Sequence, residues 1–219
     1  MREGATPRCR LEQWGRRPWV RALTALLVSG ATACGSDPAS PPATPLPTLP
    51  ESALVGYAMQ TQVLDAAAIA AEVADPDAVA AALEGMRSAT ERRFSSHREP
   101  EQQVIARTIR FASASQATEY IGWLEQHAAD VLGAGPHNET VELAGAVAYS
   151  HDPNGCCPGK EMVWWLVAWA RGTDALVLMV GGTQVRSGVV ESLATSLDSE
   201  VAADLRRAGR SAAPPPGAE

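Results

Sequence analysis

The sequence predicts an α+β domain in which helices pack on an antiparallel sheet. Several segments alternate apolar and polar residues at the spacing of two that is typical of strands, and a short polar turn separates some neighbours. Segments with helical periodicity lie between the runs of strands and after the last one. Short strands that arrive in antiparallel runs with helices between them favour a layered sheet-and-helix sandwich.

The first predicted elements are two short helices followed by two strands. Asp65 is a helix cap, and Asp75 with Pro76 places a cap and a first-turn proline before a second helix that stops at Gly85. A polar turn then separates two extended apolar segments. The helices are expected at 66–73 and 77–84, and the strands at 89–95 and 103–111.

A longer helix is predicted to begin at Ser113, because Ser113 and Gln116 form a capping box. Apolar residues recur behind it at helical spacing as far as Gly133, which predicts one continuous helix. Its buried stripe is expected to contain Ala117, Tyr120, Ile121, Leu124, Ala128 and Val131.

The second half of the domain is predicted to contain three strands and a final helix. Residues 141–149 alternate as one strand that Gly145 bends or bulges. Residues 162–170 and 175–180 form a hairpin, and the first of these segments is apolar on both faces, as in a central strand. The final helix is expected to bury Val190, Leu193, Leu197, Val201 and Leu205.

An arginine-rich and then apolar leader comes before this domain. Residues 1–33 hold six arginines and two glutamates, and their apolar run is shorter than the roughly 20 residues that a membrane-spanning helix needs. Small residues at 31–33 fit a cleavage site. We therefore expect 1–33 to be a signal peptide and the mature protein to begin at Cys34.

Cys34 directly follows the expected cleavage point and is followed by Gly35 and Ser36. This segment resembles the lipobox of bacterial envelope lipoproteins, with Ala31 where those proteins usually carry leucine. The resemblance implies that Cys34 carries a diacylglycerol, with acyl chains such as palmitate, on the extracytoplasmic face of the cell membrane. Two buried acyl chains give stable anchoring. Plain secretion is the alternative, because small residues at 31 and 33 also satisfy ordinary signal cleavage.

Proline-rich segments are expected on both sides of the domain. Residues 34–50 are predicted to be the lipidated cysteine and an extended tether, 51–207 the folded domain and 208–219 a disordered tail. Once the leader is removed, 12 basic and 23 acidic side chains remain, which gives a net charge of −11. Such a surface repels phosphate backbones, so nucleic acid is not an expected partner.

The element order on an exported, tethered domain resembles actinobacterial envelope lipoproteins with a Mog1/PsbP-like sandwich. This group is similar to the extracellular sensor domains of some mycobacterial Ser/Thr kinases. The resemblance extends over about 54–205 and rests on segments such as 108–133 and 145–169. It implies an apolar or lipid ligand, cell-wall binding or no known role, and it carries over no functional residue.

Two neighbouring cysteines, Cys156 and Cys157, stand in a turn-rich segment. In an oxidising compartment they are the thiols left to pair. Adjacent Cα atoms lie about 3.8 Å apart, below the usual 4.4–6.8 Å of a disulfide, so a bridge between them is a strained, reducible candidate. Unpaired or intermolecularly paired thiols and a redox pair remain open. A metal site with His151 or Asp152 lacks the spacing of a zinc site, and no metal is predicted.

Trp123, Trp165 and Trp169 are candidate ligand-lining residues, because aromatic walls hold apolar ligands. The alternative is that these side chains are core. The histidines at 97, 127 and 137 fit ordinary surface positions, and the sequence contains no nucleophile-elbow, zinc-protease or phosphate-loop motif. We therefore expect no catalytic residue and no cofactor.

These observations favour a membrane-anchored, extracytoplasmic lipoprotein with a non-catalytic binding domain. Its expected partner is an apolar or lipid-like ligand or an envelope protein. Two alternatives stand beside it: a thiol or redox enzyme that uses Cys156 and Cys157, and a structural envelope protein without a small ligand.

Overall fold

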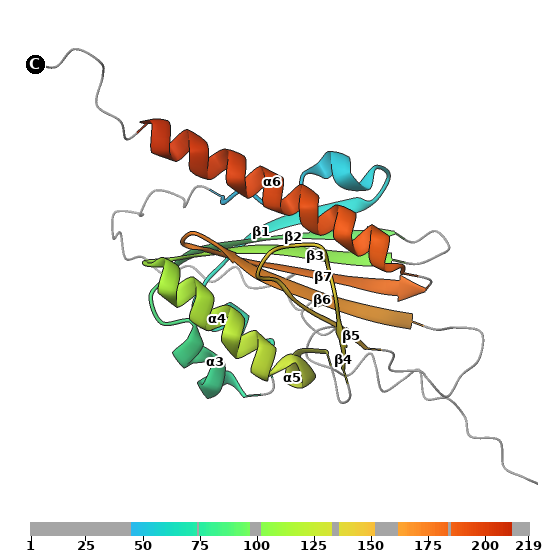
Figure 1. Cartoon of the computed structure of the whole chain (residues 1–219), viewed down its shortest axis with the longest axis horizontal. Helices are drawn as coiled ribbons and strands as arrows, with labels where there is room; N and C mark the ends of the chain where they lie inside the picture. The colour runs from blue at the N-terminus through green and yellow to red at the C-terminus, as the bar shows by residue number, and fades with distance from the viewer. Residues whose placement is uncertain are drawn as a thin grey trace, which may run out of the picture.

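The computed structural model describes residues 45–73, 75–96, 102–132, 136–151, 162–183 and 185–211. These residues form a seven-stranded sheet in the order β1-β2-β3-β7-β6-β5-β4, with helices on both faces (Figure 1). Every pair of neighbouring strands is antiparallel. The predicted α+β class, an antiparallel sheet with helices packed on it, is confirmed.

The strands are β1 (Ala58–Leu64), β2 (Met86–Ser96), β3 (Gln102–Phe111), β4 (His137–Glu139), β5 (Val147–His151), β6 (Met162–Arg171) and β7 (Asp174–Thr183). The helices are the 3₁₀ helix η2 (Glu51–Leu54) and the α-helices α2 (Ala66–Ala70), α3 (Pro76–Ala82), α4 (Ala114–Gln126), α5 (Ala128–Leu132) and α6 (Ser187–Ser211). The two hairpins β2–β3 and β6–β7 join through the pairing of β3 with β7 in the middle of the sheet.

Helices α2 to α5 cover one face of the sheet, and the long helix α6 covers the other (Figure 1). Strand β6 shows how the sequence builds both layers, because alternate side chains point to opposite faces. Leu166 and Ala168 join the core beneath α4, whereas Trp165, Val167 and Trp169 join the core beneath α6. The predicted central strand that is covered on both sides is confirmed.

The predicted helix caps are also confirmed. The carboxylate of Asp65 accepts from the Ala68 N–H at 2.7 Å, and that of Asp75 accepts from the Ala78 N–H at 3.2 Å. The hydroxyl of Ser113 accepts from the Gln116 N–H at 3.3 Å. Each cap satisfies one of the backbone donors that a helix start leaves without a partner inside the helix.

The helix that begins after Ser113 is shorter than predicted. It ends at Gln126, the C-cap residue His127 has φ −113° and ψ 21°, and α5 follows as a separate helix. The Asp130 N–H donates to the His127 carbonyl at 2.9 Å, and the Asp130 carboxylate lies 2.9 Å from the His127 ring. These contacts begin the new helix α5. The apolar residues keep their helical spacing across the break, which is why the sequence predicted one continuous helix.

The segment 141–149 is not one strand, which corrects the prediction. Only Val147–His151 forms β5, and the preceding residues form a loop in which Gly145 has a φ of 73°. Val141 and Leu143 pack on the α6 side, whereas Val147 and Tyr149 pack on the α4 side. The apolar residues therefore keep a spacing of two across the turn, but those before the turn and those after it pack on opposite faces of the sheet.

The last residues of the predicted tether belong to the folded domain. Leu46 and Leu49 are buried beside the sheet, and the Leu46 N–H donates to the Thr90 hydroxyl at 2.7 Å. The hydroxyls of Thr48 and Thr108 donate to carbonyl oxygens, at 3.1 and 2.7 Å. An extended proline-rich segment leaves its backbone polar groups open to such bonds. The domain boundary therefore lies before 51, and at the other end α6 continues past 207 to Ser211.

Within the described ranges, no helix combines the length and apolar character that crossing a membrane requires.

Candidate functional site

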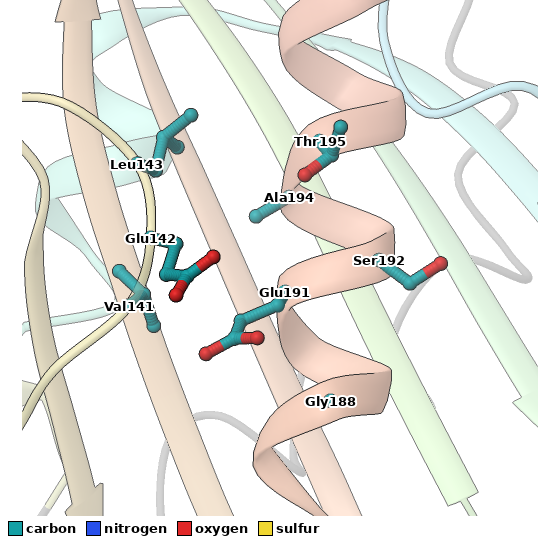
Figure 2. A pocket seen from close by; sticks show the side chains of 8 residues that line it. All are labelled: Val141, Glu142, Leu143, Gly188, Glu191, Ser192, Ala194 and Thr195. Carbon is teal, nitrogen blue, oxygen red and sulfur yellow. The ribbon is translucent and has the colours of Figure 1, made fainter.

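A pocket of about 240 Å³ lies between the first half of α6 and the loop that joins β4 to β5 (Figure 2). The loop supplies one wall and the helix supplies the other. The lining residues are Val141, Glu142, Leu143, Gly188, Glu191, Ser192, Ala194 and Thr195.

Local hydrogen bonds and core packing hold the loop wall in place. The Leu143 N–H donates to the Val141 carbonyl at 2.8 Å, and the Ala146 N–H donates to the Leu143 carbonyl at 3.1 Å. Gly145 takes the left-handed backbone conformation that glycine adopts without strain. Val141 and Leu143 pack against the core beneath α6, and Glu142 between them is exposed.

The helix wall is held by an apolar stripe and by polar contacts from the sheet. Val190 and Leu197 are fully buried, as their helical spacing predicts. Further along α6, Asp198 accepts from the Trp169 indole N–H at 3.0 Å and lies 3.5 Å from the Arg171 guanidinium. Both walls of the pocket are therefore parts of the packed domain.

The pocket is acidic and rich in acceptors. Glu142 and Glu191 point toward each other from opposite walls, whereas Ser192 points away from the loop (Figure 2). Two carboxylates and the hydroxyl of Thr195 complement a group that donates hydrogen bonds or carries positive charge. Its volume of about 240 Å³ is below the 300–1,000 Å³ typical of ligand pockets, so the pocket matches a group of side-chain size.

A second polar feature is a buried ion-pair cluster on the opposite face, beneath α2. Glu91 on β2 and Arg107 on β3 are direct cross-strand partners, and Glu72 follows α2. The guanidinium of Arg107 bonds both carboxylates, with Nη2 of Arg107 2.6 Å from Oε2 of Glu72. Arg93 bonds the same two carboxylates, at 3.0 Å for Glu72. Nε2 of Gln62 donates to Glu91 at 2.7 Å.

This cluster is electrically balanced within the sheet. Burial acts to raise the pKa of Glu91, but attraction to Arg107 and then Arg93 outweighs it and holds the pKa below the usual glutamate range. Burial opposes the charge on Arg107, and the two carboxylates raise its pKa above the usual arginine value. Burial also raises the pKa of the neighbouring Tyr120. The carboxylates already accept from several donors, so the cluster supports the sheet and leaves no free base.

The three tryptophans predicted to line a ligand site do not meet. Trp165 and Trp169 lie beneath α6, at 7% and 1% exposure, and belong to the core. Trp123 lies on α4, on the opposite face of the sheet. The three side chains therefore cannot form one wall, and for Trp165 and Trp169 the core alternative holds.

Trp123 is part of an aromatic row along α4. Its ring stacks with Tyr120 at a centroid distance of 6.2 Å and with His127 at 4.7 Å, and Tyr120 in turn contacts Phe111 at 5.7 Å. The ring of Trp123 is thus stacked against its neighbours Tyr120 and His127 within the domain. The buried indole N–H groups of Trp123 and Trp165 have no hydrogen-bond partner among the described residues.

The predicted cysteine sites, Cys34 and the Cys156–Cys157 pair, lie outside the described residues, as does His97. His137 is exposed on β4. In the part of the chain that the structure describes, no group of three or more histidine, cysteine or acidic side chains is arranged to hold a metal ion. Glu142 and Glu191 were not predicted, because they are 49 residues apart and neither stands in a motif.

No protein-family model matches this chain, and no curated protein matches it. Among solved structures, the fold is similar to the extracellular domain of PknH from Mycobacterium tuberculosis, with a TM-score of 0.45 and 10% sequence identity. The match covers 64% of this chain and 77% of that one.

Proposed function

We propose that this chain is an extracytoplasmic lipoprotein that Cys34 anchors in the membrane and whose domain acts by binding rather than by catalysis. Export and anchoring are supported by the arginine-rich leader, its apolar run and the Ala-Thr-Ala-Cys sequence at 31–34. A diacylglycerol on Cys34 buries two acyl chains, which suffices for stable attachment. The folded domain is then not needed for attachment to the membrane, and its surface is available to bind a partner.

The observation that carries the mode of binding is the packing of both sheet faces. Trp165 and Trp169, the expected wall of an apolar site, are covered by α6. On the other face, Leu166 and Ile109 have no exposed surface beneath the helices. Because these layers are filled by the domain's own side chains, we propose a partner that contacts the surface, rather than a lipid held inside the sandwich.

The pocket at α6 is a concave point of contact for such a partner. Its walls belong to the packed domain, and its size fits one projecting group. A protein partner that inserts one side chain there agrees with this geometry better than an extended acyl chain does.

Anchoring is tested by fractionation of cells that produce the full chain with a C-terminal epitope. The wild-type protein is expected in the membrane fraction and soluble only in detergent. Cys34→Ser is expected to leave the membrane fraction, whereas Cys9→Ser, a matched change inside the leader, is expected to behave as wild type. Wild-type protein in the cytosol with Met1 still attached would contradict export, and membrane-bound Cys34→Ser would contradict the lipid anchor.

The mode of binding is tested by native mass spectrometry of the protein purified in detergent from its own host. The expected spectrum shows the polypeptide with its covalent lipid and no further lipid-sized adduct. An adduct of lipid mass that survives detergent exchange and is lost on unfolding would show a ligand inside the domain and would contradict binding at the surface.

A further inference from the structure

Strand β1 forms one edge of the sheet, and its own residues carry none of the sequence features that usually keep sheet edges from pairing. It stands at one end of the strand order and pairs only with β2, so its other side has no strand partner among the described residues. Natural edge strands are protected by lysine, proline, bulges or short length. Ala58–Leu64 has no charge and no proline, and it pairs with β2 in one unbroken register over seven residues.

The opposite edge of the sheet differs in length and in charge. Strand β4 has only three residues, and Glu139 on it accepts from the Ser150 hydroxyl at 2.6 Å. A strand of this length with a charged end offers little backbone for a new strand to follow. Of the two edges, β1 is therefore the one suited to further pairing, and residues 60–63 on it are exposed.

The sequence of β1 is nearly the same when it is read from either end around Thr61. It reads Ala-Met-Gln-Thr-Gln-Val-Leu. When a second copy pairs with it in antiparallel fashion around Thr61, the two threonines lie opposite each other. Gln60 then lies opposite Gln62 of the second copy, and Met59 lies opposite Val63 of that copy. Each side chain thus meets one of its own chemical type.

The two faces of such a pair are also matched. Met59 packs on the α6 side of the sheet, and Thr61 and Val63 share that side because successive residues alternate. Gln62 points to the other side, where it donates to Glu91. In the paired strands, apolar side chains and threonines therefore line one face and amides line the other, and no like charges oppose each other.

We propose that a second copy of this chain docks on β1, antiparallel and centred on Thr61, so that the two sheets become one continuous sheet across a two-fold axis. Such an interface is isologous, since each copy offers the same strand. About half of the opposed residue pairs would exchange two backbone hydrogen bonds each, which uses the outward N–H and C=O groups of β1. We propose a second copy of this chain as the partner, because the β1 sequence is nearly symmetric about Thr61 and so complements itself in an antiparallel pair.

Cysteine cross-linking tests both the contact and its register. Opposed residues of an antiparallel pair have Cα atoms about 4.5–5.5 Å apart, within the reach of a disulfide. The full-length Thr61→Cys chain is expected to form a reducible dimer, and mass spectrometry is expected to identify a peptide pair joined through the introduced thiols of the two copies. The wild-type chain, run in parallel, measures the background from the native cysteines.

Gln60→Cys is the matched control, because its two copies are diagonal neighbours about 7–8 Å apart and out of disulfide reach. It is expected to stay monomeric alone and to link when mixed with Gln62→Cys. Equal linking of Gln60→Cys and Thr61→Cys, or no linking of a folded Thr61→Cys chain, would overturn the proposal.

The mass of the detergent-extracted wild-type chain is the second measurement. Light scattering corrected for detergent is expected to give two polypeptides per particle. Thr61→Lys places two like charges opposite each other and is expected to give one polypeptide, whereas the uncharged Thr61→Val is expected to keep two. Circular dichroism confirms that each variant is folded. A single-chain wild type, or a dimer unaffected by Thr61→Lys, would contradict docking on β1.

Discussion

Neutralising Glu91 is expected to destabilise the domain strongly, although the change to glutamine keeps its size. The Glu91 side chain has no exposed surface, and that of Arg107 is 5% exposed, so water cannot replace the lost charge without movement of the sheet. Removal of one partner from a buried ion pair costs about 3–5 kcal/mol. Glu72 still contacts Arg107 at 2.6 Å, so we expect the lower end, about 3 kcal/mol.

The loss can be measured by thermal or urea unfolding followed by circular dichroism. For a domain of about 150 residues, 3 kcal/mol corresponds to a fall in Tm of about 6–12 °C. Glu84→Gln, a change at an exposed glutamate, is the matched control and is expected to alter stability by no more than about 0.5 kcal/mol.

The pH dependence provides a separate check on the same residue. Because the two arginines hold the folded-state pKa of Glu91 below its unfolded value, its stabilisation is complete above the unfolded pKa and is lost as the pH falls through the folded one. The stability difference between wild type and Glu91→Gln should therefore be full at neutral pH and shrink below about pH 4. A difference under about 1 kcal/mol at neutral pH, or one that does not change with acidification, would refute the reasoning.

Three further predictions concern packing, capping and thiols. Gly181→Ala should destabilise the domain by about 1–3 kcal/mol in urea unfolding, because its Cβ would lie 2.6 Å from the Trp164 ring; unchanged stability would mean that the ring moves freely. Ser113→Ala should cost about 1 kcal/mol by the same assay, since it removes the α4 cap, and a neutral effect would contradict that role. Thiol titration without reductant should find Cys156 and Cys157 bridged, and two free thiols in the native protein would exclude both the bridge and an oxidised redox pair.

Local chemistry was sufficient to predict much of the fold. Asp65, Asp75 and Ser113 cap helices where their side chains and the following residues predict helix starts. The turn between β6 and β7 follows from two apolar segments separated by four residues that include Gly172, whose φ is 60°. These features depend on contacts close in sequence, which is why they can be recognised without the tertiary structure.

Strand β1 was not predicted, because residues 60–63 at its middle are exposed on both faces of the sheet and the Gln-Thr-Gln run carries no apolar signal. It is a strand because β2 offers it a partner, and this pairing depends on residues about 30 positions away. The loop before β5 was misassigned for the related reason that alternation does not show where the backbone turns. The spacing of apolar residues shows that side chains are buried on one side of the backbone. Here the side of the sheet on which they pack changes at the turn that contains Gly145.

The candidate site could be predicted only in part. The sequence places Trp165 and Trp169 on one strand face, which is correct, but it does not say that α6 covers them. Glu142 and Glu191 meet because a loop and a helix from distant parts of the chain pack on the same side of the sheet. The cross-strand pairing of Glu91 with Arg107 likewise depends on the register of β2 and β3.

The most direct test of the proposed function is a mass spectrum of the N-terminal peptide from protein purified out of its own host. The proposal predicts that this peptide begins at Cys34 and carries the mass of a thioether-linked diacylglycerol. A peptide that begins at Met1, or an unmodified Cys34 at the mature N-terminus, would contradict the lipid anchor.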